Sequence, residues 1–229
     1  PVAAGHDQFP LEMAQGILNR REIVELQDVF AWDHTLNMTY LALNLSHYVN
    51  GVAKKHGEVS QHMFSSYVID SITNGVHAGA WTSASFAVLF DKYIPGWRQD
   101  NFSLRYALSI PRNEIWQAHV HAKQRFLQYV NRQANIGMDA ETMTIGYARR
   151  VTAYKRPARL LSDLDRLKKI HAQVGKIQVL YAGKAHPMDT VGKELISRLF
   201  AARQSLKGAI KIAFLDNYDM GLGRLMTSG

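Results

Sequence analysis

Residues 144–161 read TIGYARRVTAYKRPARLL, and this stretch decides the fold of the second half of the chain. A short β-type run leads into a cationic turn, which is followed by an amphipathic stretch typical of a helix. In a parallel α/β unit, the carboxyl end of the strand and the amino end of the helix face one crevice that favours an anion. Four cations would lie in that crevice: Arg149, Arg150, Lys155 and Arg156. A solvated basic face on a surface helix is the plainer alternative.

The residues around and after this stretch alternate between two kinds of element. Strands are expected over 144–147, 177–182 and 210–215, and helices over 157–170 and 189–204. This alternation predicts the α/β class, with right-handed crossovers and a parallel, Rossmann-like sheet. A parallel sheet normally has both faces covered and continues beyond three strands, so we expect further residues to complete it.

The residues before about 140 are mostly helical in pattern. We expect helices over 10–28, 38–52, 83–92 and 112–133, and a strand over 67–72 that ends in a turn at Thr73, Asn74 and Gly75. The last of these helices should bury a stripe of Trp116, Val120, Leu127 and Val130. Gly51 would lie inside the helix over 38–52. Close approach by a sugar or a backbone would explain a glycine there, and so would simple packing.

Composition narrows the class of protein and of ligand. With 229 residues, 47% of them apolar, the chain can bury a sizeable core, and no apolar run is long enough to span a membrane. The absence of cysteine excludes disulfides and fits a cytoplasmic protein. A net charge of +8 suits an anionic ligand. Because the basic cluster lacks aromatic residues interleaved for base stacking, phosphate is favoured over nucleic acid.

Metal and glycosidase chemistry are not indicated. His119 and His121 stand two residues apart on a predicted helix, so their side chains point in different directions and cannot chelate one ion. No carboxylate pair of the glycosidase kind is evident, since Asp163, Asp165 and Asp216 suit exposed helix or strand-end positions.

Six ordered blocks of sequence resemble one known family. They are PVAAGHDQF at 1–9, YVNGVAKKHGEVSQHMF at 48–64, ITNGVHAGAW at 72–81, IGYARRVTAYKRPARLL at 145–161, YAGKAHPMDTVGKELI at 181–196 and FLDNYDM at 214–220. The chain resembles the α-glucan (glycogen, starch) phosphorylases, especially their short bacterial and archaeal branch. The resemblance implies transfer of a glucosyl unit between an α-1,4-glucan end and inorganic phosphate, giving glucose 1-phosphate, with pyridoxal phosphate as cofactor. It also implies a GT-B-type glycosyltransferase with two Rossmann-like lobes. Residues 1–76 would be the helical end of the first lobe and 77–229 an incomplete second lobe.

The resemblance also assigns roles at matching positions. Arg150 and Lys155 align with the residues that bind the substrate phosphate, and we take them as catalytic. Tyr154, Asn74 and Asn50 are the candidates for binding the sugar.

Four further residues are candidates for the cofactor. Arg149, Trp81 and Tyr218 align with cofactor-binding positions of the family. Lys184 joins them because it follows a predicted strand at its carboxyl end. Asp219 departs from the larger animal enzymes, which have a basic residue there, but the short branch shares the acidic residue.

The resemblance finally suggests that the chain is a fragment. It begins at Pro1, and no segment matches the family's cofactor-binding lysine, so we expect this chain alone to be inactive. A homo-oligomer is possible for the intact protein. Two other readings stay open: a non-catalytic module that binds glucan or phosphate, and a retaining glycosyltransferase that uses a nucleotide sugar.

Overall fold

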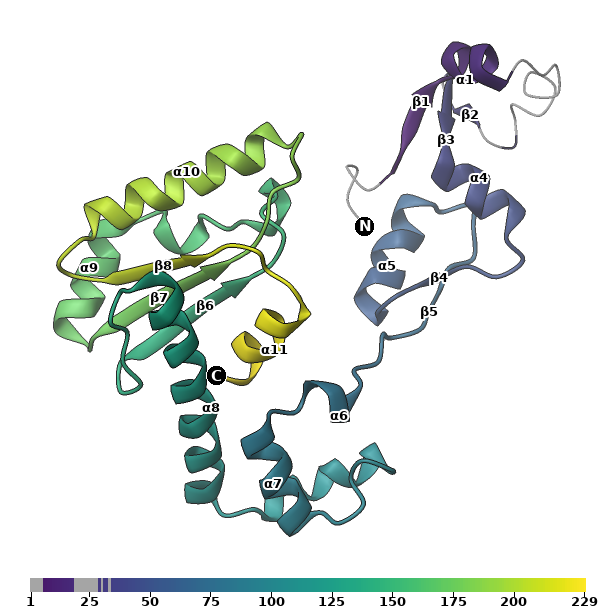
Figure 1. Ribbon diagram of the computed structural model, residues 1–229. Coiled ribbons are helices and arrows are strands. Elements are labelled where there is room, and N and C mark those ends of the chain that lie inside the picture. Colours follow the sequence, from purple (N-terminus) through teal and green to yellow (C-terminus); the bar gives the residue numbers. More distant parts are fainter. Residues whose placement is uncertain (1–5, 19–28, 30, 33) are drawn as a thin grey trace. The chain divides into compact units, whose positions relative to one another are not determined.

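The computed structural model describes residues 6–18, 29, 31–32 and 34–229, in two compact units. Unit 1 is Pro1–Val76 and unit 2 is His77–Gly229. Figure 1 shows the elements of each.

Unit 1 is built from short helices and very short strands (Figure 1). In chain order the elements are β1 (Gln8–Pro10), α1 (Leu11–Leu18), β2 (Ala31–Trp32), β3 (Thr35–Asn37), α4 (Met38–Leu45), β4 (Asn50–Gly51), α5 (Lys54–Met63) and β5 (Asp70–Ser71). The first three strands form an antiparallel sheet in the order β1-β3-β2, and β4 pairs with β5 in parallel.

The helix expected over 38–52 is much shorter in the structure. Asn37 caps its start, because the Oδ1 atom accepts the backbone N–H of Thr39 at 2.9 Å. The helix ends at Leu45, and the backbone is already extended at Ser46. Leu45 is 72% exposed, so the apolar stripe does not continue as a buried face. The prediction of a helix through residue 52 is therefore wrong.

Gly51 consequently lies in a strand and not inside a helix. A Cβ atom at Gly51 would come within 2.5 Å of the backbone nitrogen of Gly57, in the first turns of α5. The close approach of a neighbouring backbone explains this glycine, as one of the sequence-based alternatives proposed.

Two other predictions in unit 1 need correction. The strand expected over 67–72 shrinks to Asp70–Ser71, because the side chain of Gln61 takes the place of a partner strand. Its Nε2 donates to the carbonyl of Tyr67 at 2.7 Å, and its Oε1 accepts the N–H of Ile69 at 2.9 Å. The helix expected over 10–28 starts after Pro10, which closes β1, and its residues 19–28 lie outside the described residues.

Unit 2 carries the parallel sheet. Its elements are α6 (Ala78–Trp81), α7 (Ala84–Tyr93), η2 (Asn101–Ser109), α8 (Arg112–Ala134), β6 (Met143–Ala148), η3 (Ala153–Lys155), η4 (Arg159–Leu161), α9 (Leu164–Gln173), β7 (Ile177–Ala182), α10 (Thr190–Ser205), β8 (Lys211–Leu215) and α11 (Met220–Ser228). The strand order is β6-β7-β8, and all pairs are parallel. The mixed α/β class and the three predicted strands are confirmed.

Two hydrophobic clusters bury the sheet from opposite faces. Alternate residues of β7 point to each side, and every residue of that strand is buried. Leu180 packs with α8 and α11, whereas Val179 and Tyr181 pack with α9 and α10. The central strand is thus enclosed on both faces, as expected for a parallel sheet.

Two helix predictions in unit 2 are corrected by local chemistry. The helix expected over 157–170 begins only at Leu164, because Arg156 adopts a left-handed conformation (φ 55°) before Pro157, and Asp163 caps the later start. In α8 the buried stripe is Ala118, Ala122, Phe126, Leu127 and Val130, whereas Trp116 is 65% exposed.

Among the described residues, we find no helix with the length and apolar character that a membrane span requires.

Candidate functional site

The loops that follow β6, β7 and β8 emerge at one edge of the sheet. The register aligns Ala148 with Ala182, and Ala182 with Leu215, so all three strands end at the same level. The structure therefore places Arg149, Lys184 and Tyr218 at the same carboxyl edge. Crevices at this edge are where open α/β sheets bind ligands.

The first two loops are joined by backbone hydrogen bonds beyond the ends of the strands. The N–H of Arg149 donates to the carbonyl of Ala182 at 3.1 Å, and the N–H of Val151 donates to the carbonyl of Lys184 at 2.9 Å. Val151 is buried, while Arg149 and Arg150 are exposed. The two arginines consequently stand on a backbone that is fixed to the neighbouring strand.

Tyr154 and Lys155 lie in η3, which follows the arginine pair in the loop after β6. The Lys155 Nζ atom lies 4.8 Å from the centroid of the Tyr154 ring, which is 46% exposed. The hydroxyl of Tyr147 donates to the carbonyl of Lys155 at 3.4 Å. Burial raises the pKa of Tyr147. The Arg149 cation lowers this pKa in part, and Tyr154 raises it further. Tyr147 is therefore neutral at physiological pH and can serve as a donor to this loop.

The cations of this segment are not neutralised within unit 2. In the part of the chain that the structure describes, no carboxylate forms an ion pair with Arg149, Arg150, Lys155, Arg156 or Lys184. The helix that follows begins at Leu164, and the carboxylate of Asp163 already accepts the N–H of Arg166 at its amino end. An anion at this segment would thus be attracted by the side-chain cations and not by α9, which corrects the expected role of that helix.

Trp81 and Tyr218 both lie beside Gly223 of α11, although they are far apart in the sequence. A Cβ atom at Gly223 would lie 3.2 Å from the Tyr218 hydroxyl and 3.9 Å from Cη2 of Trp81. Gly223 leaves room there for two aromatic side chains. Next to them is a hollow of about 810 Å³, lined by Trp81, Arg125 and Arg224 among others.

Asp219 has a structural role that sequence reasoning missed. Its Oδ1 accepts the N–H of Leu222 at 2.8 Å and so caps α11. An acidic residue at this position is explained by the helix that it starts. The signal was present in the sequence, because an aspartate three residues before an apolar helix position is typical of a cap.

The sugar candidates Asn50 and Asn74 lie in unit 1. The N–H of Asn74 donates to the carbonyl of Val52 at 3.0 Å, which extends the β4–β5 pairing beyond the strands themselves. The Asn50 side chain donates to the carbonyl of Gly51 at 3.2 Å. Both asparagines are exposed, on neighbouring segments of unit 1. Tyr154, the third sugar candidate, belongs to unit 2.

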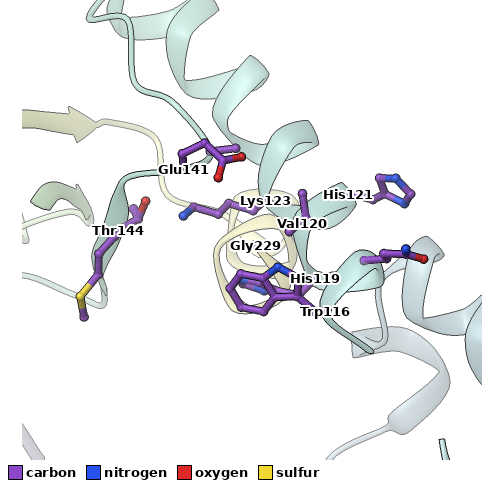
Figure 2. Close-up of a pocket in the computed structure, with 11 residues that line it drawn as sticks. Trp116, His119, Val120, His121, Lys123, Glu141, Thr144 and Gly229 are labelled. Carbon is purple, nitrogen blue, oxygen red and sulfur yellow. The ribbon is translucent and has the colours of Figure 1, made fainter. Parts of the chain in front are cut away.

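A separate hollow of about 570 Å³ lies between α8 and the start of β6, and Figure 2 shows its lining. It contains none of the site residues expected from the sequence. The Lys123 ammonium is held there by the carbonyl of Thr142 at 2.8 Å. His121 points away from His119 and Trp116 in Figure 2. Nowhere among the described residues do three or more metal-binding side chains gather in one place.

Comparisons with known proteins give one consistent result. A family model described as carbohydrate phosphorylase matches residues 6–229. The maltodextrin phosphorylase of Thermococcus litoralis is 34% identical, with 100% of this chain and 31% of that protein covered. The glycogen phosphorylase of Aquifex aeolicus is 34% identical, covering 84% of this chain and 32% of that protein. The glycogen phosphorylase of Mycobacterium tuberculosis is 32% identical, with 100% of this chain and 31% of that protein covered. The chain spans about a third of the length of these curated relatives.

Proposed function

The chain belongs to the carbohydrate phosphorylase family, and we propose that it forms part of an α-1,4-glucan phosphorylase. The intact enzyme would transfer a glucosyl unit from a glucan end to inorganic phosphate and release glucose 1-phosphate. The observation that carries this proposal is the cationic edge of the sheet. Arg149 and Lys184 lie there in the loops after two adjacent strands, and neither has a carboxylate partner among the described residues.

In this proposal Arg150 and Lys155 are the phosphate clamp. Arg150 presents a planar fork that can bond two phosphate oxygens, and Lys155 supplies a compact charge on a flexible stem. Together they neutralise the attacking phosphate and hold it in place while positive charge develops on the anomeric carbon. Tyr154, beside Lys155, offers a ring face and a hydroxyl to the sugar.

The residues expected at the cofactor also suit pyridoxal phosphate. Trp81 and Tyr218 together supply aromatic surface around Gly223, and Arg149 supplies a cation for a phosphate group. When bound, the cofactor supplies a second phosphate that exchanges a proton with the substrate phosphate. Arg149 and Lys184 hold that charge in this proposal.

The two units correspond in this proposal to parts of two lobes. Residues 1–76 form the end of the first GT-B lobe and contribute Asn50 and Asn74 to the sugar site. Residues 77–229 form the first part of the second lobe. We place the enzyme in the cytoplasm, with α-glucan and phosphate or glucose 1-phosphate as its ligands, and with homo-oligomer formation possible.

The test of the clamp is a pair of arginine variants in the intact enzyme. Arg150→Ala removes a charge-assisted bond of about 1.5 to 3 kcal/mol, so the catalytic efficiency with phosphate should fall by about one to two orders of magnitude. Glucan affinity should change far less. Arg159→Ala is the matched control, because Arg159 is exposed in η4 and should be a solvated charge. Equal small effects of both substitutions would contradict the proposal and leave a charged surface segment.

A further inference from the structure

Two glycines lie where the loop that carries the candidate clamp passes closest to its neighbours. Gly183 follows β7 and Gly192 lies in the first turn of α10. Both are buried, and neither has a positive φ angle, so the backbone conformation at these positions does not require glycine. Each must be explained by the space that a side chain would occupy.

Gly183 faces the main chain of the arginine pair. A Cβ atom at Gly183 would collide with the carbonyl oxygen of Arg149 and would lie only 2.9 Å from Cγ2 of Val151. The collision is with backbone, so no rotamer change can relieve it. The carbonyl would have to move by about 1 Å to regain an ordinary contact.

The loop has little freedom to make that movement locally. The hydrogen bonds from Arg149 to Ala182 and from Val151 to Lys184 bracket Gly183 on both sides. Arg150 sits between these two anchored residues. Displacement of the carbonyl would therefore carry the Arg150 backbone, and with it the guanidinium, away from its present position.

Gly192 limits the same loop from the α10 side. A Cβ atom there would lie 2.6 Å from the carbonyl oxygen of Val151, 2.9 Å from the Asp189 carboxylate and 3.0 Å from Cβ of Ala185. Val151 itself is 1% exposed. The backbone of Val151 is thus held between the β7 loop and the first turn of α10.

We propose that Gly183 and Gly192 are positioning residues for the phosphate clamp: by having no side chain, they let the Arg149–Val151 backbone lie against the β7 loop and α10, and so set where Arg150 meets an inorganic phosphate. This inference rests on the proposed function for the identity of the ligand. The packing on which it is built is independent of that function.

The test uses alanine variants in the intact enzyme. Gly183→Ala should raise the KM for phosphate by about tenfold or more, since a displacement of 1 Å at a positioned group costs rates of this order. The KM for glucan should change little, and the variant should stay folded although the added methyl group lowers its melting temperature. Calorimetric titration with inorganic phosphate should show the same loss of affinity without any turnover. Gly192→Ala should act in the same direction.

Gly175→Ala is the control. Gly175 precedes β7, has no positive φ angle, and has nothing within 4 Å of a Cβ atom. It should leave phosphate affinity unchanged. Equal losses in Gly183→Ala and Gly175→Ala, or an equal rise in the KM for glucan and for phosphate, would overturn the inference. Failure of both glycine variants to fold would assign the two glycines to stability and overturn it as well.

The Arg150→Ala variant separates this inference from the proposed function. If Arg150→Ala weakens phosphate use and Gly183→Ala does not, only the positioning role is wrong. If Arg150→Ala leaves phosphate use unchanged, the clamp itself is wrong, whatever the glycine variants do.

Discussion

The strand pair β4–β5 in unit 1 and the sheet β6-β7-β8 in unit 2 are both parallel, but they are held together in different ways. The pair consists of two residues on each side, and Asn50 and Asp70 in it are exposed. The sheet has a central strand that is buried on both faces between two hydrophobic clusters. The difference shows that apolar burial stabilises the sheet, whereas close backbone contacts and single side-chain hydrogen bonds define the pair.

The largest expected effect tests burial in the sheet. Leu180→Ala removes a side chain that is fully buried between β7 and α8, and should cost about 2 to 5 kcal/mol of unfolding free energy in unit 2. Ile72→Ala, next to β5, should cost little because Ile72 is 56% exposed. Hydrogen exchange of the amides in each unit measures both changes. Comparable losses would show that the strand pair also depends on apolar burial.

A somewhat smaller effect tests the backbone contact in unit 1. Gly51→Ala would force a methyl group to within 2.5 Å of the Gly57 nitrogen and 2.7 Å of the His56 ring, so we expect a loss of about 1 to 3 kcal/mol. Gly75→Ala is the control, with nothing within 4 Å of its Cβ position. Amide exchange in α5 is the measurement. A neutral Gly51→Ala variant would show that the contact can relax freely.

The same contrast explains which parts of the fold were predictable from the sequence. Strands over 144–147 and 177–182 were correctly expected, because short β-type runs alternate there with helical patterns. Of the two, only the strand over 177–182 is buried along its whole length. The helix over 38–52 was not, because its apolar spacing continues past Leu45 although the chain leaves the helix there and pairs with β5 as an extended segment. Sequence periodicity shows which face could be buried but not which partner covers it.

The candidate site divides in a similar way. The cationic segment and the turn after β7 were identified from their order along the chain, because parallel strands end at one edge. The position of Trp81 and Tyr218 beside Gly223 could not be foreseen without the resemblance, since it depends on how α6 and α11 pack together. The left-handed Arg156, which delays α9, has no clear signal beyond the proline that follows it.

Helix starts offer a third and smaller effect. Asp163 caps α9 through a 2.9 Å hydrogen bond, whereas α5 begins at Lys54 after Ala53, whose side chain provides no cap. Asp163→Ala should cost about 0.5 to 2 kcal/mol of local stability in unit 2, and Asp163→Asn should keep most of it. Ala53→Ser should stabilise α5 in unit 1. Amide exchange in the first turns of each helix would show these changes, and an unchanged α5 would mean that its start is determined by the Gly51 contact alone.

The smallest effect appears only in alkaline solution, and it compares one tyrosine from each region. Burial raises the pKa of Tyr181 in the sheet to about 12, with a further contribution from Tyr147. In unit 1 the hydrogen bond to Asp70 raises the pKa of the exposed Tyr48. Asp70→Asn should therefore lower the pKa of Tyr48 and leave that of Tyr181 unchanged, as followed by the ultraviolet absorbance of tyrosinate.

The two tyrosines should also differ in their effect on stability. A tyrosine whose pKa is higher in the folded state than its ordinary value of about 10 holds its proton more tightly when folded. Its contribution to stability is therefore complete below pH 10 and is lost as the pH rises through 12. Unit 2 should lose unfolding free energy over this range, and Tyr181→Phe should make that loss smaller, because the phenylalanine ring fills the same space without a titrating group. Tyr48→Phe should have little influence, since its site is exposed to solvent. An identical alkaline loss in the native protein and in the Tyr181→Phe variant would show that burial within the sheet does not control this titration.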